Sequence, residues 1–432
     1  MSSARSIGAV TDNLVPLPGC SRGSPEPHGA SHNDTIEVVL KIVERCNLVC
    51  PYCYFFFSGD DSFKRHPPTI PKGVLLDLVA FLRNAALSRG KKRIRIVLHG
   101  GEPLMLKKRV FREMCELFRT EVGSVCELDI GVQTNGVLID PEWVEIFAEY
   151  DLRIGVSMDG PEHIHNLTRI TKKGRGTYAE TRRGWSLLLE AAEQGRISDP
   201  GIICVVSPEH SGTEIFKHYA IEMQAVGVDF LLPDITHDSP EATPEFVAGC
   251  GRFLVDVYNA WSKAGGRCRI RIIYEATGPM LNDEACRQSM TSKYDPFGSI
   301  VVSSSGEISP DDVLRGVDPE FRDTGLRLGM HGLHEVHQSP PWKTLARAQQ
   351  QVPAECRDCI WLNACGGGLP QHRYSKAKSF DNPSVFCAAL KQFHGHVASC
   401  LILSGSPVAE IERRMQMEWT APDAFEIPDP VV

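Results

Sequence analysis

The stretch CNLVCPYCYFF, Cys46–Phe56, places three cysteines within eight residues, directly after the apolar run IEVVLKIVE, Ile36–Glu44. This short run, rich in β-branched residues, predicts a buried strand. Four thiolates close a structural metal site, whereas three leave one position open for a ligand, as in catalytic zinc sites. The stretch therefore predicts a reactive metal centre at the end of the first strand, although zinc with a remote fourth ligand would also fit.

Composition narrows the class of protein. The chain has 432 residues, 42% hydrophobic and 23% charged residues, and a net charge of -8, as in a soluble globular protein that does not bind nucleic acid. It has no apolar run long enough to span a membrane, and MSSARSIGAV lacks the features of a signal peptide. We therefore expect a cytoplasmic protein, in which most of the 15 cysteines are not in disulfides.

Strand and helix patterns alternate from residue 36 to residue 233. Strands are expected at 36–44, 93–100, 127–136, 152–160, 201–210 and 228–234, each followed by an amphipathic helix. Six β-α units without a Gly-rich dinucleotide motif favour an α/β fold with a complete or partial β/α barrel. Unusual polar stretches follow the strands, as expected of an active site at their carboxyl ends.

Composition and cysteine positions suggest how the chain is divided into regions. We expect a mobile N-terminal arm at 1–34, the barrel at 35–255, a linking region at 256–300, and a C-terminal cysteine-containing domain at 301–432. The stretches 269–281 and 298–312 suggest a small β element.

The Cys-x3-Cys-x2-Cys motif after the first strand resembles that of the radical SAM enzymes. The resemblance implies that Cys46, Cys50 and Cys53 hold a [4Fe–4S] cluster whose open iron binds S-adenosylmethionine. It also implies that S-adenosylmethionine is contacted by Tyr52, Gly100, Gly101, Glu102, Asn135, Ser157 and Arg169. The glycines would let the backbone approach the ligand closely, and the Arg169 fork would pair with the methionyl carboxylate. Asn135 and Ser157 could instead be ordinary strand-end caps.

A second group of cysteines, Cys356, Cys359, Cys365 and Cys387, resembles the SPASM domain of radical SAM peptide-modifying enzymes. That domain usually carries two auxiliary clusters, but cysteines expected for the first are replaced here by Leu369 and Asp311. The resemblance therefore implies one auxiliary [4Fe–4S] cluster with four thiolate ligands, although four thiolates at this spacing could also hold zinc.

The stretches CGGGLPQHRYS, 365–375, and FDNPSVFC, 380–387, resemble maturases that form cyclophanes in ribosomally made peptides. This implies a cross-link between an aromatic ring and an unactivated Cβ, with a precursor peptide as partner and a flavodoxin or ferredoxin as electron donor. The reaction needs a base. The resemblance points to Asp312, with Asp311 as second candidate, while Asp234, His237 and Asp238 follow the sixth strand. All of these also suit ordinary turns.

Three alternatives remain open at this stage. Another radical SAM peptide modification, such as thioether, formylglycine or epimer formation, would use the same motifs. A non-catalytic iron–sulfur or zinc protein would not need a three-cysteine site. The negative charge argues against the RNA-modifying branch of the superfamily.

Overall fold

The computed structural model describes residues 34–292 and 295–418, so the expected N-terminal arm lies outside the described residues except for Asp34. Within these ranges the strands form one sheet in the order β7-β6-β5-β4-β3-β2-β1-β8-β9. All neighbouring pairs are parallel except β8 and β9. The strands are β1 (Thr35–Val43), β2 (Arg93–Gly100), β3 (Glu127–Thr134), β4 (Leu152–Ser157), β5 (Gly201–Val205), β6 (Gly227–Leu231), β7 (Arg269–Ile270), β8 (Ser299–Val302) and β9 (Ile308–Ser309).

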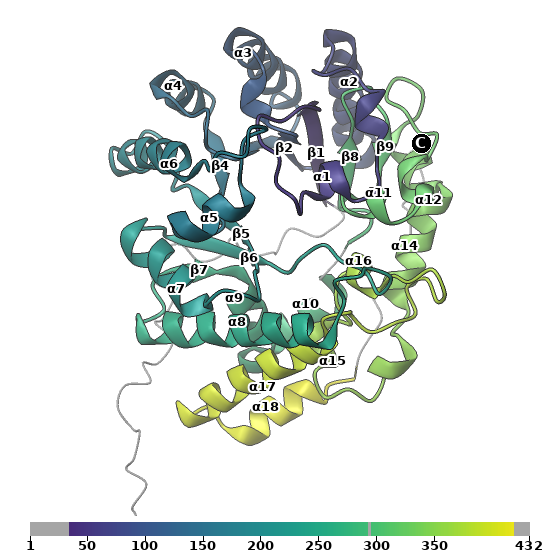
Figure 1. Cartoon of the computed structure of the whole chain (residues 1–432). Coiled ribbons are helices and arrows are strands. Elements are labelled where there is room, and N and C mark those ends of the chain that lie inside the picture. The colour runs from purple at the N-terminus through teal and green to yellow at the C-terminus, as the bar shows by residue number, and fades with distance from the viewer. Residues whose placement is uncertain (1–33, 293–294, 419–432) are drawn as a thin grey trace, which may run out of the picture.

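The sheet curves around an opening, and its helices lie on the outside (Figure 1). The covering helices are α2 (Lys72–Arg89), α3 (Lys108–Leu117), α4 (Pro141–Glu149), α6 (Tyr178–Glu193), α7 (Gly212–Lys217) and α8 (Pro244–Lys263). Burial alternates along β2, where Ile94, Ile96 and Leu98 are fully buried and the residues between them are half-buried. One face therefore packs on helices, and the other lines an open interior. The partial β/α barrel predicted from the sequence is confirmed, with β8 added beside β1.

One expected element is wrong. Residues 269–281 were expected to be β structure, but only β7 pairs with the sheet, and α9 (Arg271–Leu281) follows at once. Ile273, Ala276, Thr277 and Met280 of α9 are buried, at the i, i+3, i+4 and i+7 spacing of a helix face. The second stretch, 298–312, does form β structure, and the expected boundary at residue 300 lies inside β8.

The other helical segments are short or belong to the C-terminal part. They are α1 (Tyr54–Phe57), η2 (Ser62–Lys64), η3 (Pro103–Met105), η4 (Phe118–Val122), α5 (Glu162–Thr168), η5 (His218–Glu222), α10 (Asp283–Ser292), α11 (Leu314–Val317), α12 (Pro319–Arg322), α13 (Leu333–Gln338), α14 (Pro340–Gln350), η6 (Ala354–Cys356), α15 (Leu362–Cys365), α16 (Pro370–Arg373), α17 (Cys387–Leu403) and α18 (Val408–Met415). In the described part of the chain, no helix has the length and apolar character needed to cross a membrane.

Ion pairs of Arg315 and His66 fasten the segment after β8 to the loop after β1. Arg315 lies 3.0 Å from Asp60, and both side chains are more than nine-tenths buried. His66 bridges Glu44 at 2.8 Å and Glu307 at 2.9 Å. The segment 307–315 is therefore held against the end of β1, which brings it to the carboxyl side of the barrel.

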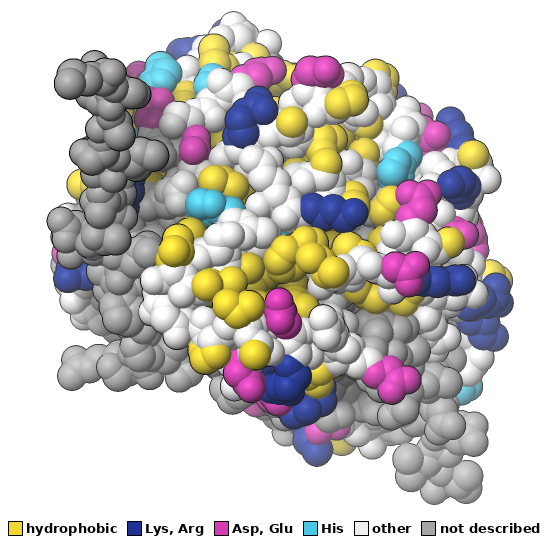
Figure 2. All heavy atoms as spheres, turned by 90° about the horizontal axis from the view of Figure 1, so that it is seen from below, with side chains coloured by type: hydrophobic (Ala, Val, Ile, Leu, Met, Phe, Trp, Pro, Cys, Tyr) yellow, Lys and Arg dark blue, Asp and Glu magenta, His cyan; other side chains and the backbone are white. Residues whose placement is uncertain are grey.

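The face seen from below in Figure 2 mixes charges of both signs around hydrophobic side chains near its centre. On the lower side of Figure 1, α17 and α18 expose Ile402, Leu403 and Val408. The described residues of this face form no continuous basic stripe of the kind that binds nucleic acid.

Candidate active site

The loop between β1 and α1 carries the first three cysteines. Cys46, Cys50 and Cys53 are all partly buried, and they lie near enough for their charges to interact. Burial raises the pKa of the Cys46 thiol to about 12 and that of Cys50 to about 11. A thiolate in this loop therefore needs a cation to balance it, and the three thiols fit an iron–sulfur cluster as that counter-charge.

The two glycines at the end of β2, Gly100 and Gly101, have a structural role in addition to the expected one. A Cβ on Gly100 would lie 2.1 Å from the carbonyl oxygen of Val43, and one on Gly101 would lie 2.3 Å from that of Arg45. The Gly101 N–H donates to Val43 O at 2.7 Å, and the Glu102 N–H donates to Arg45 O at 2.9 Å. The sequence interpretation explained these glycines by the approach of a ligand. In the structure they let β2 pack directly on the backbone that leads into the cysteine loop.

Glu102 connects the ends of β2 and β3. Its buried carboxylate accepts hydrogen bonds from Leu104 N at 3.0 Å, Thr134 Oγ1 at 2.6 Å and Asn135 N at 2.8 Å. Burial raises the pKa of Glu102. The Asn135 amide donates to Asn47 Oδ1 at 2.8 Å, in the cysteine loop. These contacts place Glu102 and Asn135 beside the proposed cluster.

Arg169 has a partner that the sequence interpretation missed. Its Nε lies 3.0 Å from Asp159 Oδ1, and both side chains are more than nine-tenths buried. The Tyr52 hydroxyl also donates to Asp159, and the Arg169 guanidinium lies 5.8 Å from the centre of the Tyr52 ring. The signal for Asp159 was its place after β4 in SMDG. Ser157, in the same stretch, accepts from the Gln133 amide at 2.8 Å.

Asp312 lies in a network that faces the barrel interior. Its Oδ2 accepts hydrogen bonds from the Lys41 ammonium and the Tyr54 hydroxyl. Lys41 also lies 3.1 Å from His99 Nδ1. Burial alone would raise the pKa of Asp312, but the charge of Lys41 and the hydrogen bonds from Lys41 and Tyr54 lower it below its usual value. Asp312 is therefore an ionised carboxylate beside Tyr54, the residue that follows Cys53.

The other acidic candidates differ in what they contact. Asp311 Oδ1 accepts from Val313 N and Leu314 N, as in a turn cap. Asp234 keeps an exposed edge, but desolvation of its carboxylate by the surrounding protein, together with the nearby charges of Asp311 and Asp312, raises its pKa to about 7.

His237 and Asp238 instead tie the loop after β6 to the C-terminal part of the chain. His237 Nε2 contacts Pro383 O at 2.8 Å, and Asp238 accepts from Lys376 N at 2.8 Å. Both side chains therefore hold the loop after β6 against residues 376–383 and have a structural role here.

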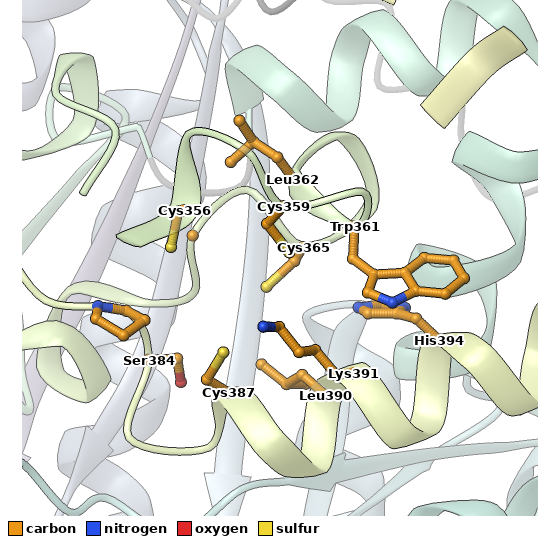
Figure 3. Close-up of a pocket in the computed structure, with 12 residues that line it drawn as sticks. Cys356, Cys359, Trp361, Leu362, Cys365, Ser384, Cys387, Leu390, Lys391 and His394 are labelled. Atoms are coloured by element: carbon orange, nitrogen blue, oxygen red, sulfur yellow. The ribbon is translucent and has the colours of Figure 1, made fainter. Parts of the chain in front are cut away.

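The second cysteine group surrounds a cavity (Figure 3). Its lining includes Cys356, Cys359, Cys365 and Cys387, together with Trp361, Leu362, Gly367, Pro383, Ser384, Leu390, Lys391 and His394. The four thiols around it match the ligand set of an iron–sulfur cluster.

Three features set the chemistry of this cavity. Burial, and to a smaller extent the charges of the other three cysteines, raise the pKa of Cys356 to about 11. Lys391 extends into the cavity from α17 toward the cysteines, and Trp361 stacks on His394 at its edge (Figure 3). In the described ranges, no three His, Cys, Asp or Glu side chains are grouped as ligands of a single metal ion.

The chain is similar in sequence to one protein superfamily and to individual enzymes. Residues 40–193 match the model of the radical SAM superfamily. The chain is 24% identical over 369 residues to a serine-type anaerobic sulfatase-maturating enzyme of Bacteroides thetaiotaomicron, which covers 82% of this chain and 87% of that protein. It is 25% identical over 370 residues to a cysteine-type enzyme of Clostridium perfringens, covering 83% and 94% of the two chains.

Solved structures agree on the fold. The structure of native anSMEcpe with bound AdoMet and the Kp18Cys peptide has a TM-score of 0.71 at 22% identity, covering 85% of this chain and 98% of that one. Streptococcus suis SuiB, bound to its precursor peptide SuiA, has a TM-score of 0.55 at 17% identity, covering 82% and 76%.

These comparisons correct the expectation that cyclophane-forming maturases are the most similar proteins, because the relatives matched along the chain are sulfatase-maturating enzymes. The chain has the radical SAM α/β fold, and the cofactors expected from its cysteines, a [4Fe–4S] cluster and S-adenosylmethionine, are those that this superfamily binds.

Proposed function

We propose that this protein is a radical SAM enzyme that oxidises a side chain of a peptide or protein substrate. The observation that carries the proposal is the ionised Asp312 carboxylate, held by Lys41 and Tyr54 next to the cysteine loop. Oxidation of a Cβ–H group releases a proton as well as a hydrogen atom and an electron, so a base must stand near the reacting carbon. The similarity to sulfatase-maturating enzymes over most of the chain supports the same reading.

The proposed residue roles follow the positions described above. Cys46, Cys50 and Cys53 would hold the cluster that binds S-adenosylmethionine, and Cys356, Cys359, Cys365 and Cys387 the auxiliary cluster. Together, the first cluster and S-adenosylmethionine supply a 5'-deoxyadenosyl radical that removes a hydrogen atom from an unactivated carbon. Tyr52, Gly100, Gly101, Glu102, Asn135, Ser157 and Arg169 would surround that cofactor, and Asp312 would accept the substrate proton.

Formylglycine formation is the product class that the relatives favour. Both serine-type and cysteine-type sulfatase-maturating enzymes match most of this chain at similar identity. A serine side chain becomes an aldehyde when it loses a hydrogen atom to the 5'-deoxyadenosyl radical, a proton to Asp312, and an electron, which the auxiliary cluster would accept. The same oxidation of a cysteine side chain, followed by exchange of sulfur for oxygen with water, gives the same aldehyde. One base at Asp312 would serve either substrate.

Cyclophane formation is the second candidate, and the resemblance of the stretches 365–375 and 380–387 to cyclophane-forming maturases favours it. Asp311 and Leu369 occupy positions where the SPASM pattern has cysteines of the first auxiliary cluster. The structure uses Asp311 as a turn cap that orients the segment carrying Asp312. Here the carbon radical would add to a neighbouring aromatic ring, which would then lose an electron and a proton.

The test is anaerobic co-expression with three substrates: a sulfatase-type peptide with serine, one with cysteine, and a precursor peptide encoded beside this protein. If the product is formylglycine, the modified peptide should contain an aldehyde that reacts with a hydrazide probe. A cyclophane predicts loss of two hydrogens without an aldehyde, free thiols, and a segment that resists fragmentation. The reaction should require an electron donor such as flavodoxin or ferredoxin. If the cluster-loaded enzyme cleaves S-adenosylmethionine but changes none of these peptides, peptide oxidation is the wrong proposal.

A further inference from the structure

Lys41 is a charged residue in the middle of an apolar strand, and its ammonium group contacts three polar side chains and lies over the Phe55 ring. It is only 2% exposed, and it lies opposite His99 in the register of β1 and β2. An ammonium group has three N–H donors. Three acceptors surround it: Asp312 Oδ2, His99 Nδ1 at 3.1 Å and Tyr54 Oη at 3.3 Å. Each donor of a protonated Lys41 therefore has an acceptor.

The protonation of His99 can be read from its neighbours. Its Nδ1 accepts a hydrogen bond from the Gly100 backbone N–H at 2.8 Å. That nitrogen is therefore unprotonated, and its single lone pair is shared between the Gly100 N–H and Lys41. His99 is thus neutral, and the charge between β1 and β2 belongs to Lys41.

The two oxygens of Asp312 have different surroundings. Oδ2 accepts from both Lys41 and Tyr54, whereas Oδ1 is buried and has no hydrogen-bond partner among the described residues. A buried carboxylate oxygen without a donor is costly. Such an atom is also the natural place for an incoming proton.

We propose that Lys41 is a positioning residue that keeps Asp312 ionised and fixes its Oδ2, leaving Oδ1 to accept the substrate proton. The inference rests on the proposed function, because it assigns a partner to the proposed base. Lys41 itself would not touch the substrate.

The other charged groups nearby act in known directions. Negative charges of Asp234 and Asp311 lie close to each other and to Asp312, and would favour its protonation. The neutral His99 and the Tyr54 hydroxyl donate or accept hydrogen bonds without supplying charge. Burial lowers the pKa of Lys41, the charge and hydrogen bond of Asp312 raise it, and the smaller effects of Arg315 and Glu44 have opposite signs. Lys41 is the cation in direct contact with Asp312, so removing its charge leaves the carboxylate among acidic neighbours.

The first test needs no peptide substrate. Infrared difference spectra of the cluster-loaded enzyme are recorded as a function of pH for wild type, Lys41→Met and Lys41→Met/Asp312→Asn. We expect Lys41→Met to show a carboxylic acid band that titrates 1 to 3 pH units above its wild-type position, as expected when an opposite charge is lost at close range, roughly 4–6 Å. The band should vanish in the double variant. If Lys41→Met does not fold, Lys41→Gln removes the same charge with a polar side chain and should show the same shift.

Lys91→Met is the matched control. Lys91 is also buried, but it donates to the backbone oxygen of Thr35 at the start of β1. Its substitution should leave the Asp312 band at its wild-type position. If Lys41→Met and Lys41→Gln also leave it there, Lys41 does not keep Asp312 ionised and the inference is wrong.

The second test uses the peptide reaction, normalised to iron content. Lys41→Met should shift the acidic limb of the rate–pH profile upward by the same 1 to 3 pH units, and Lys41→Arg should restore it. A folding defect alone would lower the rate at every pH. If Asp312→Asn modifies peptide at the wild-type rate, the base assignment in the proposed function fails, while the infrared result still decides whether Lys41 controls Asp312.

Discussion

Replacing Gly101 with alanine should separate β2 from the cysteine loop. The new Cβ would lie 2.3 Å from Arg45 O and 2.5 Å from Arg45 C, and both atoms belong to the backbone. Neither can rotate away as a side chain would, so the loop must move. Two hydrogen bonds would be lost or weakened, from the N–H of Gly101 to Val43 O and from that of Glu102 to Arg45 O.

The magnitude follows from these contacts. Each backbone hydrogen bond contributes about 0.5–1.5 kcal/mol, and overpacking costs about 1–3 kcal/mol. Together they predict a loss of roughly 2–6 kcal/mol in the free energy of unfolding. A folded protein has only about 5–15 kcal/mol in total, so the variant should be only marginally stable.

Urea unfolding of the iron-free chain, followed by circular dichroism, measures this loss, and iron content after anaerobic reconstitution reports on the loop. Gly73→Ala, in α2, is the control because its Cβ would meet nothing within 4 Å. It should be neutral or stabilise the helix by up to about 1 kcal/mol. An unfolding free energy of Gly101→Ala within about 0.5 kcal/mol of wild type would refute the packing argument.

Three further changes test other parts of the site. Asp159→Asn should cost about 3–5 kcal/mol of stability, because it leaves the buried Arg169 charge unpaired. Cys387→Ser should remove about four iron atoms per chain, since one ligand of the auxiliary cluster is lost. Hydrogen bonds to Glu307 and Glu44 outweigh burial and raise the pKa of His66 to about 9. Its stabilising effect is therefore complete below about pH 6.5 and is lost as pH rises through about 9, and His66→Gln should abolish this dependence.

Each of these changes has a control. Arg169→Met combined with Asp159→Asn should recover most of the stability, because no unpaired charge is left in the interior. Cys400→Ser changes a cysteine of the same helix that does not line the cavity, so iron analysis should give the wild-type value. Unfolding free energies measured from pH 6 to pH 10 that fall equally in wild type and His66→Gln would rule out the histidine as the source.

Much of the site could be predicted because its signals are local. The cysteines of the β1 loop lie within eight residues, and GGE and SMDG directly follow strands. The β-α alternation was also visible, since each unit buries its own apolar residues. The prediction of β structure at 269–281 was wrong. The residues R-I-R-I alternate as in a strand, but the later apolar residues have the spacing of a helix face.

The amino-acid sequence by itself determined the barrel and the two cysteine groups, since both depend on residues close together in the chain. Only the tertiary structure decided the surroundings of Asp312. Parallel pairing of β8 with β1 brings residues about 260 positions apart into register, for example Val39 with Val301. That pairing sets Asp312 against Lys41 and Tyr54. Nothing local to either segment specifies this contact, because the buried ion pair can form only after β8 has paired with β1.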